Sequence, residues 1–127
     1  MNAPMIIAVD FDGTCVDHRY PDVGPSSPGA VVTLQRLVKD GHRLVLFTMR
    51  SGKELDDAVA WFKSNRIELY GVQRNPDQDS WTTSPKAYAQ LYIDDAAFGC
   101  PLIQPAAFRR ACVNWDKVSQ KFWPDLP

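Results

Sequence analysis

Four aspartates stand in two pairs, and each pair directly follows a short apolar run. The stretch MIIAVDFDGT contains Asp10 and Asp12, and the stretch LYIDD contains Asp94 and Asp95. Carboxylates repel one another and are costly to bury, so they converge only where a positive charge joins them. A hard divalent cation such as Mg²⁺ takes carboxylate and carbonyl oxygens and keeps several waters, and the sequence has no Cys or His cluster for a softer metal. The four aspartates therefore predict a magnesium site.

The aspartate pairs and one threonine come at the ends of expected β-strands. Short apolar runs predict strands over residues 5–9, 44–47, 69–72 and 91–93. The run from Leu44 to Phe47 is apolar at every position, as in a parallel strand buried on both faces. Thr48 ends this run, so we expect its hydroxyl beside the carboxylates.

Apolar residues at helical spacing predict helices between and after these strands. We expect the first helix to be capped by Ser26 or Ser27. It should hold Pro28 in its first turn and end at Gly41. Further helices are expected over residues 53–65, 84–89 and 114–122, and a fifth short strand over residues 101–103.

Alternating strands and helices joined by short loops predict the fold class. We expect an α/β fold with a doubly wound, Rossmann-like, mostly parallel sheet and helices on both faces. In such sheets, functional groups gather beyond the carboxyl ends of the strands, where Asp10, Thr48 and Asp94 are expected. At 127 residues the chain is long enough for one domain with its own core.

The same segments resemble the motifs of the haloacid dehalogenase (HAD) superfamily of phosphotransferases. DFDGT looks like the first motif, and LVLFT, which ends at Thr48, resembles the second. Lys86 resembles the third motif and LYIDD the fourth, so the resemblance covers residues 5 to about 98. The gaps between these motifs leave no room for the cap domain that is usual in the superfamily. The chain particularly resembles small bacterial capless HAD-like hydrolases with a similar DHRYP loop.

The resemblance implies a magnesium-dependent phosphohydrolase that acts on a phosphomonoester through an aspartyl phosphate. Asp10 is then the nucleophile, and Asp12 is the general acid and base. The metal is then held by the Asp10 carboxylate, the Asp12 carbonyl and Asp94, with Asp95 bound directly or through water.

The resemblance also implies residues that bind the transferred phosphoryl group. Thr48 supplies a hydroxyl to the phosphoryl oxygens, and Lys86 balances the charge of Asp10 and the transferred group. Residues of the first turn, the following loop and the second motif are further candidates for substrate binding: Gly13, His18, Arg19, Met49 and Arg50.

Composition limits the classes of partner. A net charge of -1 gives no broad basic field, which argues against general nucleic-acid or anionic-membrane binding. No run approaches the ~20 apolar residues of a membrane span, and the N-terminus reaches an acid too early for a signal peptide. Three cysteines, an odd count, do not suggest a disulfide framework. These features favour a cytoplasmic protein, and the resemblance implies a phosphorylated substrate that we expect to be a small molecule.

Other functions share parts of this pattern. A signalling receiver domain also combines acids, Thr and Lys on an α/β sheet, but the DxDGT order argues against it. A phosphatase of macromolecules, either phosphoproteins or nucleic-acid ends, is permitted by an open site. A phosphate-binding HAD-like module without turnover is a third alternative. A homo-oligomer in which one copy covers the open site of another is compatible with each enzyme.

Overall fold

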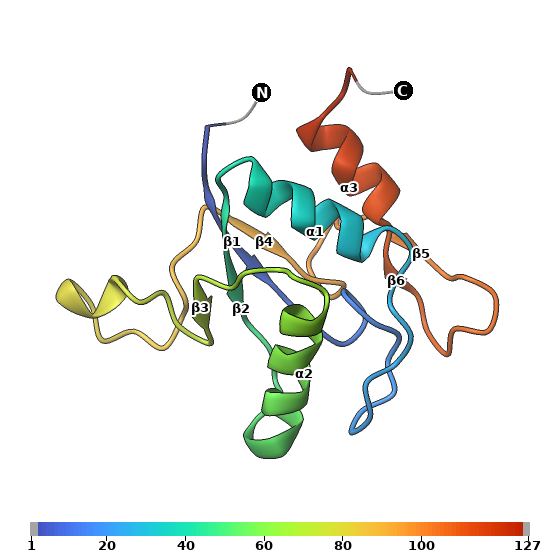
Figure 1. Cartoon of the computed structure of the whole chain (residues 1–127), viewed down its shortest axis with the longest axis horizontal. Coiled ribbons are helices and arrows are strands. Elements are labelled where there is room, and N and C mark those ends of the chain that lie inside the picture. The colour runs from blue at the N-terminus through green and yellow to red at the C-terminus, as the bar shows by residue number, and fades with distance from the viewer. Residues whose placement is uncertain (1–2, 126–127) are drawn as a thin grey trace.

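A four-stranded parallel sheet forms the centre of the fold in the computed structural model, which describes residues 3–125 (Figure 1). Its strands are β1 (Ile6–Val9), β2 (Arg43–Leu46), β3 (Gly71–Val72) and β4 (Leu91–Ile93), in the order β3-β2-β1-β4. All neighbouring pairs run parallel. The four expected strands and the α/β class are thus confirmed, and β1 lies between β2 and β4, so the residues that follow these three strands meet at one edge.

Three α-helices in the described part of the chain flank this sheet: α1 (Ala30–Lys39), α2 (Gly52–Ser64) and α3 (Trp115–Phe122). The register places Ile7 and Val9 of β1 beside Leu44 and Leu46 of β2, and therefore on one face of the sheet. These four side chains are buried in one apolar cluster that includes residues of all three helices, such as Leu34, Phe62 and Val118. A membrane-crossing helix would need to be longer and more apolar than any in residues 3–125.

The start of α1 differs from the expected cap. Gly29 occupies the N-cap position with φ 79°, and no side chain caps the helix there. The Ser26 hydroxyl instead accepts a hydrogen bond from Trp61 Nε1 at 3.2 Å. The prediction of a Ser26 or Ser27 cap was wrong because a contact with α2, distant in sequence, takes the Ser26 side chain. The expected end of the helix at Gly41 is confirmed. The last residue of α1 is Lys39, Asp40 is its C-cap, and Gly41 follows with φ 96°.

No α-helix forms over residues 84–89, where the sequence predicts one. The buried Gln78 side chain, in a single 3-10 turn (η1, Gln78–Ser80), takes the backbone groups that such a helix would use. Its Nε2 donates to the carbonyls of Ser84 (3.0 Å) and Lys86 (2.7 Å), and its Oε1 accepts from the Tyr88 amide at 2.7 Å. In a helix the Tyr88 amide would bond to the Ser84 carbonyl, so the glutamine replaces the helical bond.

A short hairpin precedes the last helix. β5 (Leu102–Ile103) pairs antiparallel with β6 (Cys112–Val113), apart from the central sheet. The strand expected over residues 101–103 is therefore present, but it does not extend the parallel sheet. The Val113 amide donates to the Gly13 carbonyl at 3.0 Å, which fastens the hairpin to the turn after β1.

Candidate functional site

A cleft of about 720 Å³ opens where β1, β2 and β4 end. Its walls come from the turn and loop after β1, the loop after β2, the residues after β4 and the β5–β6 hairpin. Most residues predicted from the sequence line it: Asp10, Asp12, His18, Thr48, Met49, Arg50, Asp94 and Asp95. The hairpin adds three residues that the sequence did not indicate, Leu102, Arg110 and Ala111.

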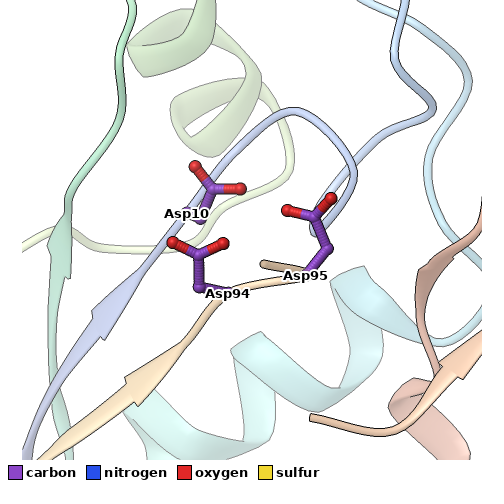
Figure 2. Close-up of side chains that lie close together, drawn as sticks. All are labelled: Asp10, Asp94 and Asp95. Atoms are coloured by element: carbon purple, nitrogen blue, oxygen red, sulfur yellow. The ribbon is translucent and has the colours of Figure 1, made fainter. Parts of the chain in front are cut away.

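Three carboxylates meet at the base of this cleft. One carboxylate oxygen each from Asp10, Asp94 and Asp95 lies within 4.8 Å of the others, and Figure 2 shows the three side chains pointing toward one another. Burial, the charge of Asp94, and a hydrogen bond and charge from Asp95 raise the pKa of Asp10 from 3.8 to about 8. A cation would remove this repulsion, and three carboxylate oxygens form a donor set suited to a hard divalent ion.

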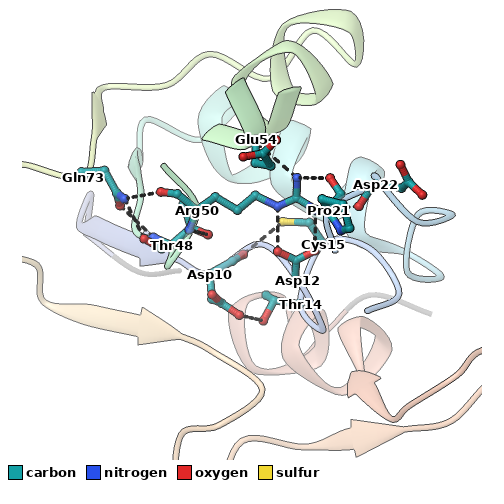
Figure 3. Close-up of polar contacts among 10 residues, drawn as sticks. All are labelled: Asp10, Asp12, Thr14, Cys15, Pro21, Asp22, Thr48, Arg50, Glu54 and Gln73. Carbon is teal, nitrogen blue, oxygen red and sulfur yellow. Dashed lines mark hydrogen bonds and ion pairs between the residues drawn. The ribbon is translucent and has the colours of Figure 1, made fainter. Parts of the chain in front are cut away.

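The buried Thr14 connects two of these aspartates. Its Oγ1 donates to Asp10 Oδ2 at 3.1 Å (Figure 3). The same oxygen accepts from the Asp95 amide at 3.1 Å. The threonine of DFDGT therefore holds the ends of β1 and β4 together. The sequence marked this residue only as part of the motif and not as a contact.

Gly13 and Phe11 shape the turn between β1 and the site. Gly13 has φ +84°, and a Cβ at this position would collide with His18 Nε2 and Asp95 Oδ2. These two atoms lie 3.1 Å apart, so a glycine is needed for His18 to reach Asp95. Phe11 is buried in the core, where its ring centroid lies 5.7 Å from that of Trp61.

Asp12 faces Arg50 and not the other aspartates. Arg50 Nε donates to Asp12 Oδ2 at 2.7 Å and Nη2 to Asp12 Oδ1 at 2.8 Å (Figure 3). The remaining guanidinium bonds go to the carbonyls of Pro21, Asp22 and Glu54. Arg50 is 1% exposed, and the hydrogen bonds to Asp12 raise its pKa against the opposing effect of burial.

This arrangement changes two expectations. Arg50 makes five hydrogen bonds through its side chain, which is the full number of N–H donors in a guanidinium. No donor is left for a substrate anion, and the Arg50 amide bonds to Thr48 Oγ1 at 3.2 Å. The Asp12 carboxylate is likewise outside the cluster of three aspartates, because the buried guanidinium binds both of its oxygens.

Gln73, which sequence reasoning missed, fixes the loop that carries Thr48. Its Oε1 accepts from the Thr48 amide at 2.8 Å, and its Nε2 donates to the carbonyls of Thr48 (2.6 Å) and Arg50 (3.2 Å). Gln73 itself adopts φ 64° just after β3. Nothing in the sequence distinguishes this glutamine from other polar loop residues.

Two predicted residues lie away from the cleft. Lys86 is exposed, and its Nζ lies 5.4 Å from the ring centroid of Tyr92 in the segment that Gln78 holds. Arg19 Nε donates to Asp17 Oδ2 at 3.0 Å, and Nη2 donates to the Ala107 carbonyl at 3.1 Å. The structure therefore does not bring Lys86 or Arg19 to the aspartates, because local contacts hold both side chains elsewhere.

No family model matches the chain, and no curated protein matches it. The chain is similar to a solved structure from Bacteroides thetaiotaomicron, described as that of a conserved protein coded by locus, with 34% sequence identity and a TM-score of 0.79. The similarity covers 98% of this chain and 94% of the Bacteroides chain. The chain belongs to the family of this conserved protein. That description states no activity for the Bacteroides protein. The family relationship therefore supports the fold, and any function has to be argued from the residues of the cleft.

Proposed function

We propose that this protein is a magnesium-dependent phosphohydrolase of the HAD type, which hydrolyses a phosphomonoester through an aspartyl phosphate on Asp10. The observation that carries the proposal is the convergence of Asp10, Asp94 and Asp95 in one cleft. These residues follow adjacent parallel strands, and Asp10 belongs to the DFDGT motif. The strand order changes direction at β1, with β2 and β3 on one side and β4 on the other, which supports a doubly wound form of the fold. Between β1 and β4 the chain forms only α1, β2, α2, β3 and η1, which supports a capless form.

The residues of the cleft fit the proposed metal. Asp10, Asp94 and Asp95 would hold it through carboxylate oxygens, and the Asp12 carbonyl is a further proposed ligand. When bound, Mg²⁺ supplies positive charge that neutralises the carboxylates and the transferred phosphoryl oxygens. The raised pKa of Asp10 then returns toward its ordinary value, and the carboxylate becomes available as a nucleophile.

The reaction that we propose has two displacements. An Asp10 carboxylate oxygen attacks phosphorus, the bond to the leaving oxygen breaks, and Asp12 gives a proton to that oxygen. Water then attacks the aspartyl phosphate, Asp12 takes a proton from it, and phosphate and the Asp10 carboxylate are released. Because Arg50 holds both Asp12 oxygens, Asp12 must turn away from Arg50 before it can act as an acid. Thr48, which lines the cleft, would contribute its hydroxyl to the phosphoryl oxygens.

Hydrolysis of para-nitrophenyl phosphate tests this proposal. We expect activity with Mg²⁺, none with a chelator, and a loss of at least about a hundredfold in kcat for Asp10→Asn. Asp116→Asn, an exposed position in α3, is the matched control and should keep wild-type activity. Full activity in a chelator, or an Asp10→Asn variant that stays within tenfold of wild type, would contradict the mechanism.

A second candidate function is phosphate binding without turnover. The observation that favours it is the Asp12–Arg50 pair, in which both carboxylate oxygens of the proposed acid already accept hydrogen bonds. Under this alternative, wild-type protein would bind inorganic phosphate in the presence of Mg²⁺ but would release no product from any phosphomonoester. The same assay, combined with a binding measurement, therefore separates the two functions.

A further inference from the structure

The β5–β6 hairpin contributes one wall of the cleft. Leu102 of β5, and Arg110 and Ala111 just before β6, line the space above the aspartates. None of these residues belongs to a motif of the proposed phosphohydrolase. Substitutions in this wall can therefore change which leaving group the cleft accepts while the aspartates stay the same.

Arg110 is the charged side chain of this wall, and it stands apart from the other basic residues of the cleft. Arg50 uses every guanidinium donor within the protein, and His18 contacts Asp95. Arg110 is exposed, and its guanidinium forms no hydrogen bond or ion pair with any residue in the range 3–125. Of the two arginines that line the cleft, Arg110 thus has its donors free for a ligand.

The backbone that carries Arg110 is fastened at several points. The carboxylate of Asp17, which is fully buried, accepts the Arg109 amide at 2.9 and 3.1 Å. Burial by itself would raise the pKa of Asp17, but hydrogen bonds from the Arg109 amide and the Arg19 side chain outweigh it and lower the pKa. Arg19 also donates to the Ala107 carbonyl at 3.1 Å. Arg110 therefore projects from a fixed loop, which reduces the entropy lost when it binds a ligand.

Exposed apolar side chains also line the cleft. Tyr20, Met49 and Leu102 all line the cleft, and they are 61%, 98% and 47% exposed. Exposed apolar side chains gathered around a polar cleft are typical of a binding surface. The cleft thus combines carboxylates at its base with an apolar rim and one free guanidinium.

We propose that Arg110 determines substrate specificity by binding a second anionic group, located in the leaving group of the phosphomonoester, while the apolar rim contacts its carbon skeleton. This inference rests on the proposed phosphohydrolase function. The transferred phosphoryl group must touch Asp10, which is partly buried at the end of β1, whereas Arg110 is exposed on the hairpin wall. In the proposed complex the guanidinium lies on the leaving-group side, where it can form a charge-assisted pair with a carboxylate or a second phosphate.

A matched pair of substrates tests this assignment: para-(carboxymethyl)phenyl phosphate and its methyl ester. The two have the same phosphoryl group and nearly the same shape, and they differ by one negative charge. We expect wild-type kcat/KM to favour the acid by about tenfold, the size of one charge-assisted hydrogen bond. Arg110→Gln should abolish this preference, and Arg110→Lys should keep part of it. Arg109→Gln is the matched control, because Arg109 is exposed, its side chain does not line the cleft, and the substitution keeps its amide bond to Asp17.

The possible outcomes separate this inference from the proposed function. Equal kcat/KM for the two compounds in the wild type would overturn the inference, as would an Arg110→Gln variant that still prefers the acid. An equal loss for both compounds in Arg110→Gln would also overturn it, because Arg110 would then bind the transferred phosphoryl group. If the wild type hydrolyses neither compound, the phosphohydrolase proposal fails. Calorimetric titration then decides the role of Arg110. If wild type binds the acid more tightly than the ester and Arg110→Gln does not, the inference is supported. If wild type binds both compounds equally, the inference is contradicted.

Discussion

The Asp10 carboxyl group lies where burial and two neighbouring carboxylates oppose its ionisation. Its pKa is raised from 3.8 to about 8, so without a divalent cation the folded protein keeps this proton to higher pH than the unfolded chain. The folded state then binds more protons than the unfolded state across this interval, and the free energy of unfolding falls as the pH rises through it.

We expect this pH dependence to disappear in Asp10→Asn, which cannot ionise. The measurement is urea denaturation with a chelator at about pH 5 and about pH 8. Wild type should lose more stability than Asp10→Asn between these two conditions, and added Mg²⁺ should restore wild type at the higher pH. Parallel stability profiles for the two proteins would show that Asp10 is not the titrating group.

Gly13 has a left-handed backbone conformation and also lies close to the side chains of His18 and Asp95. A comparison with Gly99 separates the effect of the backbone conformation from that of the close contacts. Gly13 and Gly99 have nearly equal φ angles, +84° and +83°, but a Cβ at Gly99 meets nothing within 4 Å. Gly99→Ala should therefore lower the free energy of unfolding by about 1–2 kcal/mol, the cost of the left-handed region alone. Gly13→Ala should cost more and also reduce phosphatase activity, because the added methyl group displaces His18 or Asp95. Equal effects of the two substitutions on stability and activity would show that this close approach has no consequence.

At the scale of elements, Arg50 joins parts of the chain that are far apart in sequence. Its guanidinium connects the turn after β1, the loop at residues 21–22 and the first turn of α2. A lysine ammonium has three donors on one nitrogen, whereas the planar guanidinium has five on three nitrogens, so lysine cannot reproduce this set of bonds.

We expect Arg50→Lys to lower the free energy of unfolding by about 2–4 kcal/mol, since it leaves buried acceptors without partners. Arg43→Lys is the control: Arg43 is exposed at the start of β2 and contacts the Tyr70 ring, which a lysine can also do. Denaturation measures the loss, and hydrogen exchange of the Asp22 amide, which donates to the Arg19 carbonyl, should be faster in Arg50→Lys alone. Unchanged exchange of this amide would mean that Arg50 does not hold the loop at residues 21–22.

The helices and strands that could be predicted from the sequence are those whose conformation depends on residues within the element itself. β1 is an apolar run, and β2 is apolar and buried from Leu44 to Leu46. The N-cap of α3 is Asn114, whose side chain accepts the Lys117 amide. The segment over residues 84–89 was not predictable in this way. Its conformation is set by the Gln78 side chain, which reaches it from outside the segment. β5 was expected, but β6 and its antiparallel pairing with β5 were not, because strands of two residues are too short to give a periodic signal.

The same distinction applies to the site. The aspartates were predictable because carboxylates after apolar strands are unusual, and the structure brings Asp10, Asp94 and Asp95 together. The residues that hold them were not predictable, because Thr14 and Gln73 act through contacts between loops. The contrast between Arg50, buried and fully bonded, and Arg110, exposed and free, also depends on three-dimensional packing that sequence patterns do not encode.

For the whole molecule, the open cleft limits how well a single chain can select a small substrate. In the capless enzyme that we propose, no lid excludes water or adds contacts to the leaving group. The leaving group would meet Arg110 and an apolar rim that remains largely exposed to solvent. Discrimination requires contacts that differ between substrates, and one guanidinium supplies about tenfold.

We therefore expect the monomer to discriminate weakly among small phosphomonoesters, and to gain selectivity only when a second copy of the chain or a large substrate covers the rim formed by Tyr20, Met49 and Leu102. The measurement is kcat/KM across a panel of phosphorylated metabolites, together with the oligomeric state by sedimentation at the same protein concentrations. Selectivity should rise with the fraction of oligomer, or appear only with phosphopeptides or phosphorylated oligonucleotides, since these cover the exposed apolar side chains. A strictly monomeric protein that prefers one metabolite over close analogues by about a thousandfold, some 4 kcal/mol, would contradict this expectation, because the open cleft lacks the contacts that such a preference needs.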